Sequence, residues 1–128
     1  MHRTILLAED DLDDQELLEE ALLSLDANVK LICFTSGVKF IENLDRIADN
    51  QLPSLIVLDY NIPELNGAEI LKRLNGLSRF ASVSKVIWST SNSPLFSKTC
   101  LDLGAKEYII KPASIEGIKQ LAEKLLSW

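Results

Sequence analysis

The chain has 128 residues, close to the usual size of one domain, and 47% of them are hydrophobic, which is enough for one core. The formal net charge of −6, with lysines and arginines scattered along the chain, argues against a nucleic-acid-binding face and against a polybasic membrane contact. The single histidine, His2, is near the start, and Cys33 and Cys100 lie far apart, so we expect neither zinc binding nor Ser-His catalysis. We interpret both cysteines as buried, reduced thiols and, with no signal peptide or membrane span in the sequence, expect a cytoplasmic location.

Short apolar runs alternate with longer amphipathic stretches along the whole chain. In chain order, the patterns predict strand 4–8, helix 17–25, strand 29–34, helix 40–48, strand 55–58, helix 70–77, strand 86–88, helix 94–104, strand 108–110 and helix 115–125. This alternation predicts an α/β fold, a doubly wound parallel sheet with helices on both faces. Because no linker, repeat or low-complexity stretch interrupts the pattern, we expect one domain over residues 1–128 and no output domain.

Two of the expected helices carry clear start signals. Ser93 precedes Pro94 as an N-cap precedes proline in the first helical position, and Ser114 precedes the last helix in the same way. Gly104 is of the type favoured just past a helix end, so we expect the fourth helix to end near it.

Polar and charged side chains follow the ends of four expected strands. Glu9 and Asp10 follow the first, Asp59 the third, Ser89 the fourth and Lys111 the fifth. The carboxyl ends of parallel strands meet at one edge of a sheet, so we expect these side chains to share a small pocket. Such a pocket would hold Mg²⁺, which prefers oxygen ligands, beside an aspartate that accepts a phosphoryl group.

Simpler interpretations exist for several of these residues. Asp59 alone could be an ordinary turn residue. Acids at a helix start favour the helix dipole, and we prefer this explanation for Asp11, Asp13 and Asp14. For the pair Glu9 and Asp10 the distant partners favour a metal site instead, since neighbouring carboxylates without a counter-ion repel each other.

The whole pattern resembles the receiver domain of two-component response regulators, which has a flavodoxin-like fold. The resemblance rests on the acidic pair Glu9 and Asp10, on Pro63 and Gly67 four and eight residues after Asp59, and on Ser89 and Lys111 thirty and fifty-two residues after it. The opening segment 5–14 is also similar to stand-alone receivers that act with phytochrome-type and other bacterial histidine kinases. The family fold implies five parallel strands in the order 2-1-3-4-5 with five helices.

The resemblance also implies a role for each matching residue. Asp59 would be the phosphoacceptor, and Ser89 and Lys111 would hold the phosphoryl oxygens. Asp10, Asp59 and the backbone carbonyl of Asn61 would bind Mg²⁺ directly, and Glu9 would act mainly through water. Serine at 89 in place of the commoner threonine and the extra acid Asp11 are departures that leave phosphorylation intact.

A switch follows from the same resemblance. Tyr108, three residues before Lys111, matches the family's switch aromatic, and Ser89 would move toward the phosphoryl group. The responding surface would comprise the fourth helix, fifth strand and fifth helix, where Leu95, Phe96, Tyr108 and Trp128 could make apolar contacts, although Leu95 and Phe96 could equally be half-buried packing residues. We also expect Lys111-Pro112 to be a candidate cis peptide that aims the lysine inward.

The implied function is a single-domain response regulator, a phosphoacceptor rather than an enzyme beyond its own phosphorylation and dephosphorylation. Its partners would be a sensor histidine kinase or phosphotransfer protein and a downstream protein of unknown identity; a homodimer is left open, and direct nucleic-acid or membrane binding is not expected. One alternative is a receiver-like scaffold that works without phosphorylation. Another is an aspartyl-phosphate phosphohydrolase, but Asn61 stands where that chemistry needs a general acid. A dinucleotide site is not supported, because no GxGxxG follows the first strand.

Overall fold

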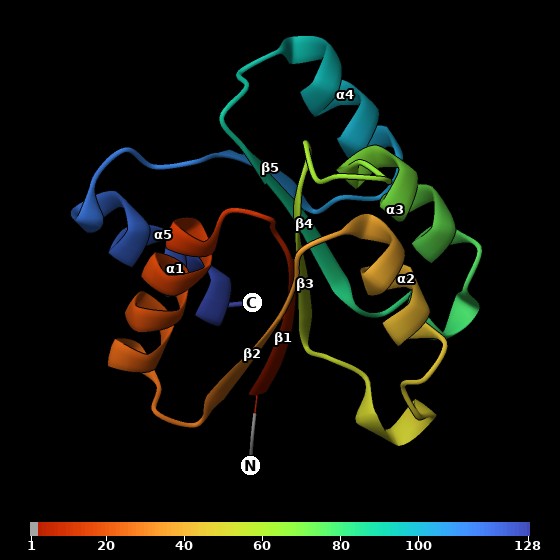
Figure 1. The fold of residues 1–128 in the computed structure, drawn as a ribbon, viewed down its shortest axis with the longest axis horizontal. Helices are drawn as coiled ribbons and strands as arrows, with labels where there is room; N and C mark the ends of the chain where they lie inside the picture. The colour runs from red at the N-terminus through yellow and green to blue at the C-terminus, as the bar shows by residue number, and fades with distance from the viewer. Residues whose placement is uncertain (1–2) are drawn as a thin grey trace.

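The computed structural model describes residues 3–128, which form a central parallel sheet with helices on both faces (Figure 1). The strands are β1 (Arg3–Ala8), β2 (Val29–Phe34), β3 (Leu55–Asp59), β4 (Ser84–Ser89) and β5 (Glu107–Ile110). The helices are α1 (Leu12–Leu25), α2 (Gly37–Leu44), α3 (Gly67–Asn75), α4 (Pro94–Asp102) and α5 (Ile115–Leu126), with 3-10 turns η1 (Asp49–Gln51) and η2 (Ser78–Phe80). The strand order is β2-β1-β3-β4-β5, so the predicted flavodoxin-like fold is confirmed.

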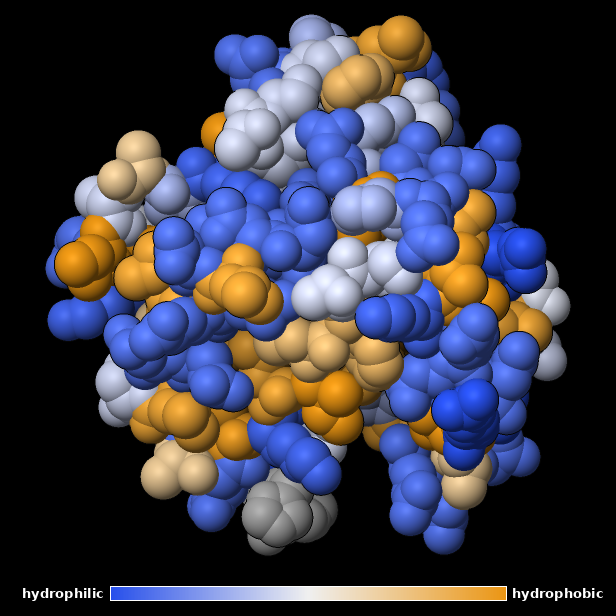
Figure 2. All heavy atoms as spheres, viewed as in Figure 1, coloured by the Kyte–Doolittle hydropathy of each residue, from blue (hydrophilic) through white to orange (hydrophobic). Residues whose placement is uncertain are grey.

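Two hydrophobic clusters lie on opposite faces of the sheet. Helices α1 and α5 cover one face, and α2, α3 and α4 cover the other (Figure 1). Strand β3 lies between β1 and β4 and is buried along its whole length, which explains its unbroken apolar sequence. Hydrophilic side chains cover most of the face seen in Figure 2, with hydrophobic atoms in smaller patches between them. Because β3 is buried along its whole length, the position of Asp59 at its end is fixed by the core of the sheet.

Side-chain caps fix the start of every long helix. The predicted caps Ser93 and Ser114 are confirmed, since each hydroxyl accepts from a backbone N–H in the first turn. Asp11 caps α1 in the same way and accepts from the N–H groups of Asp13 and Asp14. Helices α2 and α3 start at caps without a sequence prediction, Ser36 and Asn66, and Asn66 forms a reciprocal capping box with Glu69.

Some helix ends differ from the prediction. Helix α2 ends at Leu44, so Ile47 and Ala48 lie outside it. The guanidinium of Arg79, from η2, donates to the carbonyl oxygens of Leu44 and Ile47 and satisfies backbone groups that a longer helix would have paired internally. Helix α3 likewise stops at Asn75, two residues before Leu77.

Helix α4 ends at Asp102, close to the expected end at Gly104, whose positive φ of 99° suits glycine.

Two further expectations need correction. No cis peptide bond occurs among residues 3–128, so the Lys111-Pro112 bond is trans, the form that most X-Pro bonds adopt. Cys33 is only half-buried, because it lies in the edge strand β2, whereas Cys100 is buried as expected; both are free thiols.

Within the described residues no helix is long and apolar enough to cross a membrane.

The first residue of α2 packs directly against the loop that follows β3. The N–H of Gly37 donates to the carbonyl of Pro63 at 3.0 Å. A Cβ added at Gly37 would lie 2.5 Å from the carbonyl oxygen of Leu65 and 2.6 Å from its Cβ. Only glycine allows the two segments to approach this closely.

We therefore predict that Gly37→Ala lowers the free energy of unfolding by roughly 1–3 kcal/mol, because backbone and a Cβ must move apart. Gly76→Ala is the matched control, since its new Cβ would lie 3.4 Å from the nearest atom and its φ is negative, so it should change stability by less than about 1 kcal/mol. Urea denaturation measures both. Equal effects of the two substitutions would contradict the tight contact at Gly37.

Candidate functional site

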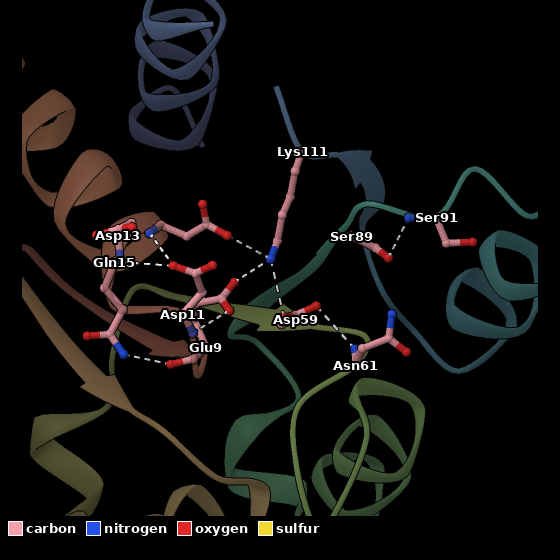
Figure 3. Close-up of polar contacts among 10 residues, drawn as sticks. Glu9, Asp11, Asp13, Gln15, Asp59, Asn61, Ser89, Ser91 and Lys111 are labelled. Carbon is pink, nitrogen blue, oxygen red and sulfur yellow. Dashed lines mark hydrogen bonds and ion pairs between the residues drawn. The ribbon is translucent and has the colours of Figure 1, made fainter. Parts of the chain in front are cut away.

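The sheet brings the predicted site residues to one edge. Asp59 ends β3 and Ser89 ends β4, while Glu9 and Lys111 each follow the last residue of a strand, β1 and β5. Glu9, Asp59 and Ser89 are buried, and Asp10 is exposed beside them. Figure 3 shows the lysine reaching down from the β5 side toward the acids. The residues at four strand ends thus lie at one edge of the sheet, as expected, and their sharing of one ligand pocket stays a prediction.

Lys111 contacts three carboxylates at once. Its Nζ lies 2.7 Å from Oε1 of Glu9, 3.1 Å from Oδ2 of Asp14 and 3.3 Å from Oδ2 of Asp59. The same ammonium lies 5.0 Å from the centre of the buried Trp88 ring. Burial alone would lower the pKa of Lys111, but the ion pair with Glu9 and the further acids outweigh it and raise the pKa above its ordinary value.

Glu9 is fully enclosed and strongly oriented. Its Oε2 accepts from the N–H of Asp11 at 3.0 Å, and its backbone carbonyl accepts from Nε2 of Gln15 at 2.6 Å, so the first turn of α1 holds it. Burial raises the pKa of Glu9 to about 7, and the nearby Asp59 adds to the shift, although Lys111 opposes it. Without further positive charge, Glu9 therefore takes up a proton near neutral pH.

Oxygen atoms suited to a hard divalent cation meet at this point. Glu9, Asp10 and Asp59 each offer a carboxylate oxygen, and these oxygens lie within 4.8 Å of one another. Oδ1 of Asp59 also accepts from the N–H of Asn61 at 3.1 Å, which ties the following turn to the pocket. An all-oxygen set of this size fits Mg²⁺, which takes one or two carboxylates and keeps several waters.

Ser91 connects the pocket to the surface of the β4–α4 loop. Its N–H donates to Oγ of Ser89 at 3.1 Å, and its carbonyl accepts from the hydroxyl of Tyr108 at 2.8 Å. Its own Oγ accepts from the N–H of Ser93, the cap of α4. A shift of Ser89 would therefore be felt both by Tyr108 and by the start of α4.

Three contacts were missing from the sequence prediction. Asp14 was interpreted as a helix-start acid, but its carboxylate also reaches Lys111. Trp88 was expected only as a strand residue, and its ring forms one wall around that ammonium. Tyr60 stacks on Phe96 with ring centres 4.3 Å apart, so Phe96 is a packing residue, as the simpler interpretation had it.

No short motif signals the contacts of Asp14 and Trp88 with Lys111.

Comparisons with known proteins agree with this geometry. The family model of the response regulator receiver domain matches residues 5–123. The chain belongs to this family. The two-component response regulator ORR4 of Oryza sativa subsp. indica is 31% identical, over 95% of this chain and 59% of the relative. This receiver domain thus spans about three fifths of that relative, and a similar share, 62%, of ARR15 of Arabidopsis thaliana.

Solved receiver structures match almost the whole chain. The phosphorylated cyanobacterial phytochrome response regulator RcpA superimposes with a TM-score of 0.89 at 26% identity, covering 98% of this chain and 91% of RcpA. The Mn²⁺-bound form of the response regulator Rcp1 gives a TM-score of 0.86 at 24% identity, covering 98% of this chain and 93% of Rcp1. The resemblance to the receiver family inferred from the residue pattern is confirmed.

The raised pKa of Glu9 predicts a specific pH dependence for the metal-free protein. The folded state holds a proton up to about pH 7 that the unfolded chain releases near 4.5, so this contribution to stability is complete below pH 4.5 and is lost as the pH rises through 7. We expect the metal-free protein to lose roughly 1–3 kcal/mol of unfolding free energy from this group over that window, relative to Glu9→Gln.

Urea denaturation in chelator at several pH values, on wild type, Glu9→Gln and the exposed control Glu16→Gln, tests this. The difference between wild type and Glu9→Gln should grow with pH, and the difference between wild type and Glu16→Gln should not. A flat difference for Glu9→Gln would contradict a proton on Glu9.

Proposed function

We propose that this receiver domain accepts a phosphoryl group on Asp59 from a phosphohistidine of a sensor histidine kinase or phosphotransfer protein. The observation that carries the proposal is the position of Asp59, a buried carboxylate fixed by β3 with metal-suited acids on one side and the ammonium of Lys111 on the other. The phosphorylated form of the structurally similar RcpA supports it. The chain would act as a single-domain response regulator in the cytoplasm, with its output through a partner protein.

In the transfer step a carboxylate oxygen of Asp59 attacks phosphorus and forms an O–P bond. The N–P bond to the donor histidine breaks, and the imidazole nitrogen keeps the electron pair. The reaction needs in-line placement and compensation of charge on the equatorial oxygens. Lys111 and the hydroxyl of Ser89 would contact those oxygens. Ser89 ends β4, the neighbour of β3, and the ammonium of Lys111 lies 3.3 Å from Asp59, which supports this assignment.

Asp10, Asp59 and the backbone carbonyl of Asn61 would hold Mg²⁺, with Glu9 acting mainly through water. When bound, the ion supplies positive charge for the attacking and transferred oxygens. The Mn²⁺-bound Rcp1, a protein of the same fold, is consistent with this assignment. Positive charge here would also favour the deprotonated form of Glu9.

Hydrolysis of the acyl phosphate would end the signal, with water attacking phosphorus and Asp59 leaving as a carboxylate. The backbone N–H groups of Asn61 and Ser91 donate to Asp59 and Ser89, so the side chains of these two residues would influence the access of water. No acidic side chain stands at 61, so the site lacks the general acid of an aspartyl-phosphate phosphohydrolase. This supports a phosphoacceptor over an enzyme that acts on small phosphate esters.

The phosphoryl group would also operate the switch. A hydroxyl of Ser89 that turns toward phosphoryl oxygen gives up its bond from the N–H of Ser91, and Ser91 is the residue to which Tyr108 donates. The loop and Tyr108 would then rearrange together and alter the surface formed by α4, β5 and α5. Leu95 and Ile110 are exposed on these elements and suit a protein partner, with a second copy of the chain as one candidate.

The direct test is intact mass after incubation with acetyl phosphate, with and without Mg²⁺. We predict a gain of one phosphoryl group in the wild type that requires Mg²⁺ and is absent in Asp59→Asn, because the amide is a poor nucleophile. Asp45→Asn is the matched control, because it makes the same change at an exposed aspartate outside the site and keeps the acceptor. A missing adduct under rapid quench, together with no binding of beryllofluoride, would favour a scaffold that works without phosphorylation.

Metal binding gives a separate prediction. Asp10→Asn removes a direct oxygen ligand and should weaken Mg²⁺ by about tenfold or more, whereas Asp13→Asn removes an exposed charge nearby and should have a small effect. Isothermal titration with Mg²⁺ measures both. Similar affinities for the two variants would rule out Asp10 as a ligand.

A further inference from the structure

The Lys111 ammonium donates to Asp14 and Asp59 and forms an ion pair with Glu9 at 2.7 Å. A lysine has three N–H bonds, and the three partners here are Glu9, Asp14 and Asp59. Asp14 is the one that does not follow a strand end; it comes from the first turn of α1 and contacts Lys111, which follows β5. A phosphoryl oxygen that needs an N–H of Lys111 must therefore displace or share one of these contacts.

The backbone of Asp14 is held in place by the N-cap of α1. Asp11 caps α1 and accepts from the N–H of Asp14 at 3.1 Å, which fixes the first helical turn. The buried ring of Trp88 lies 5.0 Å from the ammonium and is a further neighbour that limits its movement. The lysine is thus confined between an aromatic wall and three acids.

We propose that Asp14 is a positioning residue that competes with the phosphoryl group for Lys111, and that phosphorylation releases Asp14 and thereby unties the start of α1 from the β5–α5 loop. This inference rests on the proposed phosphorylation of Asp59 and adds a second route by which the pocket acts on the fold.

Solvent exposure decides which contact is given up. The side chain of Glu9 is 0% exposed, so water cannot replace the lysine at its carboxyl group. Asp59 is the acceptor itself and cannot move away. Asp14 is 29% exposed, and water can replace the lysine at its carboxylate. A phosphoryl group, with about two negative charges and three acceptor oxygens, therefore displaces Asp14 most easily.

The chain offers a matched control one residue away. Asp13 lies in the same first turn, and its N–H donates to the same Asp11 oxygen at 2.9 Å. Its exposed side chain is absent from the contacts of Lys111. Asp13→Asn and Asp14→Asn thus remove the same charge from the same helix end, and only the second removes a competitor for Lys111.

The first measurement is the affinity of each variant for beryllofluoride in the presence of Mg²⁺, at constant ionic strength. Asp14→Asn should bind beryllofluoride roughly threefold to tenfold more tightly than Asp13→Asn, because the ion pair between Asp14 and Lys111 is absent and does not have to be broken. Equal affinities, or weaker binding by Asp14→Asn, would overturn the competition. Absence of binding in wild type and both variants would instead overturn the phosphoacceptor function, and this inference with it.

A second measurement examines the resting contact without any phosphoryl analogue. In a Trp128→Phe background Trp88 is the remaining tryptophan, and its fluorescence reports on the ammonium beside its ring. Lys111→Met in the same background gives the reference Trp88 fluorescence in the absence of the ammonium. Asp14→Asn should change the Trp88 emission and Asp13→Asn should not, while Asp14→Glu should restore it in part. Identical spectra for Asp14→Asn and Asp13→Asn would show that Asp14 does not position the lysine.

Discussion

The ion pairs of Lys111 are the interaction on which the rest of the site depends. Two carboxylates of the pocket, Glu9 and Asp59, are almost free of water, and such groups destabilise the fold unless positive charge lies close to them. One ammonium faces Glu9, Asp14 and Asp59, so negative charge remains in excess. That excess, added to burial, is why Glu9 keeps a proton to about pH 7 and why the same oxygens suit a divalent cation. Stability and cation binding are thus two consequences of one charge imbalance.

The parallel sheet makes this imbalance possible. The register of β1, β3, β4 and β5 aligns the strand ends, so that residues up to about a hundred positions apart become neighbours. Each strand is held on both faces by a separate hydrophobic cluster, and the polar groups at its end therefore sit on a rigid base. The hydrophobic core supplies the free energy that orders these residues. The carboxylates can therefore stay close together although their mutual repulsion is unfavourable.

This division explains how far the sequence could predict the structure. The parallel α/β class and the residues at the strand ends follow from local patterns, since apolar runs identify buried strands and a residue just past a strand must lie at the sheet edge. The strand order came only from the resemblance to the receiver family. The contact of Asp14 with Lys111 could not be found in this way, because it depends on how α1 is rotated relative to the β5–α5 loop. The end of α2 at Leu44 depends in the same way on Arg79, a residue of a distant turn. Local sequence determined the elements, and tertiary contacts determined where they stop and what they touch.

The pocket is connected to the rest of the domain through two different kinds of contact. On the β4 side, Ser91 carries hydrogen bonds from Ser89 to Tyr108 and to the cap of α4, all between neutral groups. On the α1 side, the connection is an ion pair between Asp14 and Lys111, which weakens with salt and with any competing anion. Neutral hydrogen bonds depend on geometry and respond to movement, whereas ion pairs respond to charge. A group that brings both bulk and charge to Asp59 would therefore act on both connections at once, through movement on the β4 side and through charge on the α1 side.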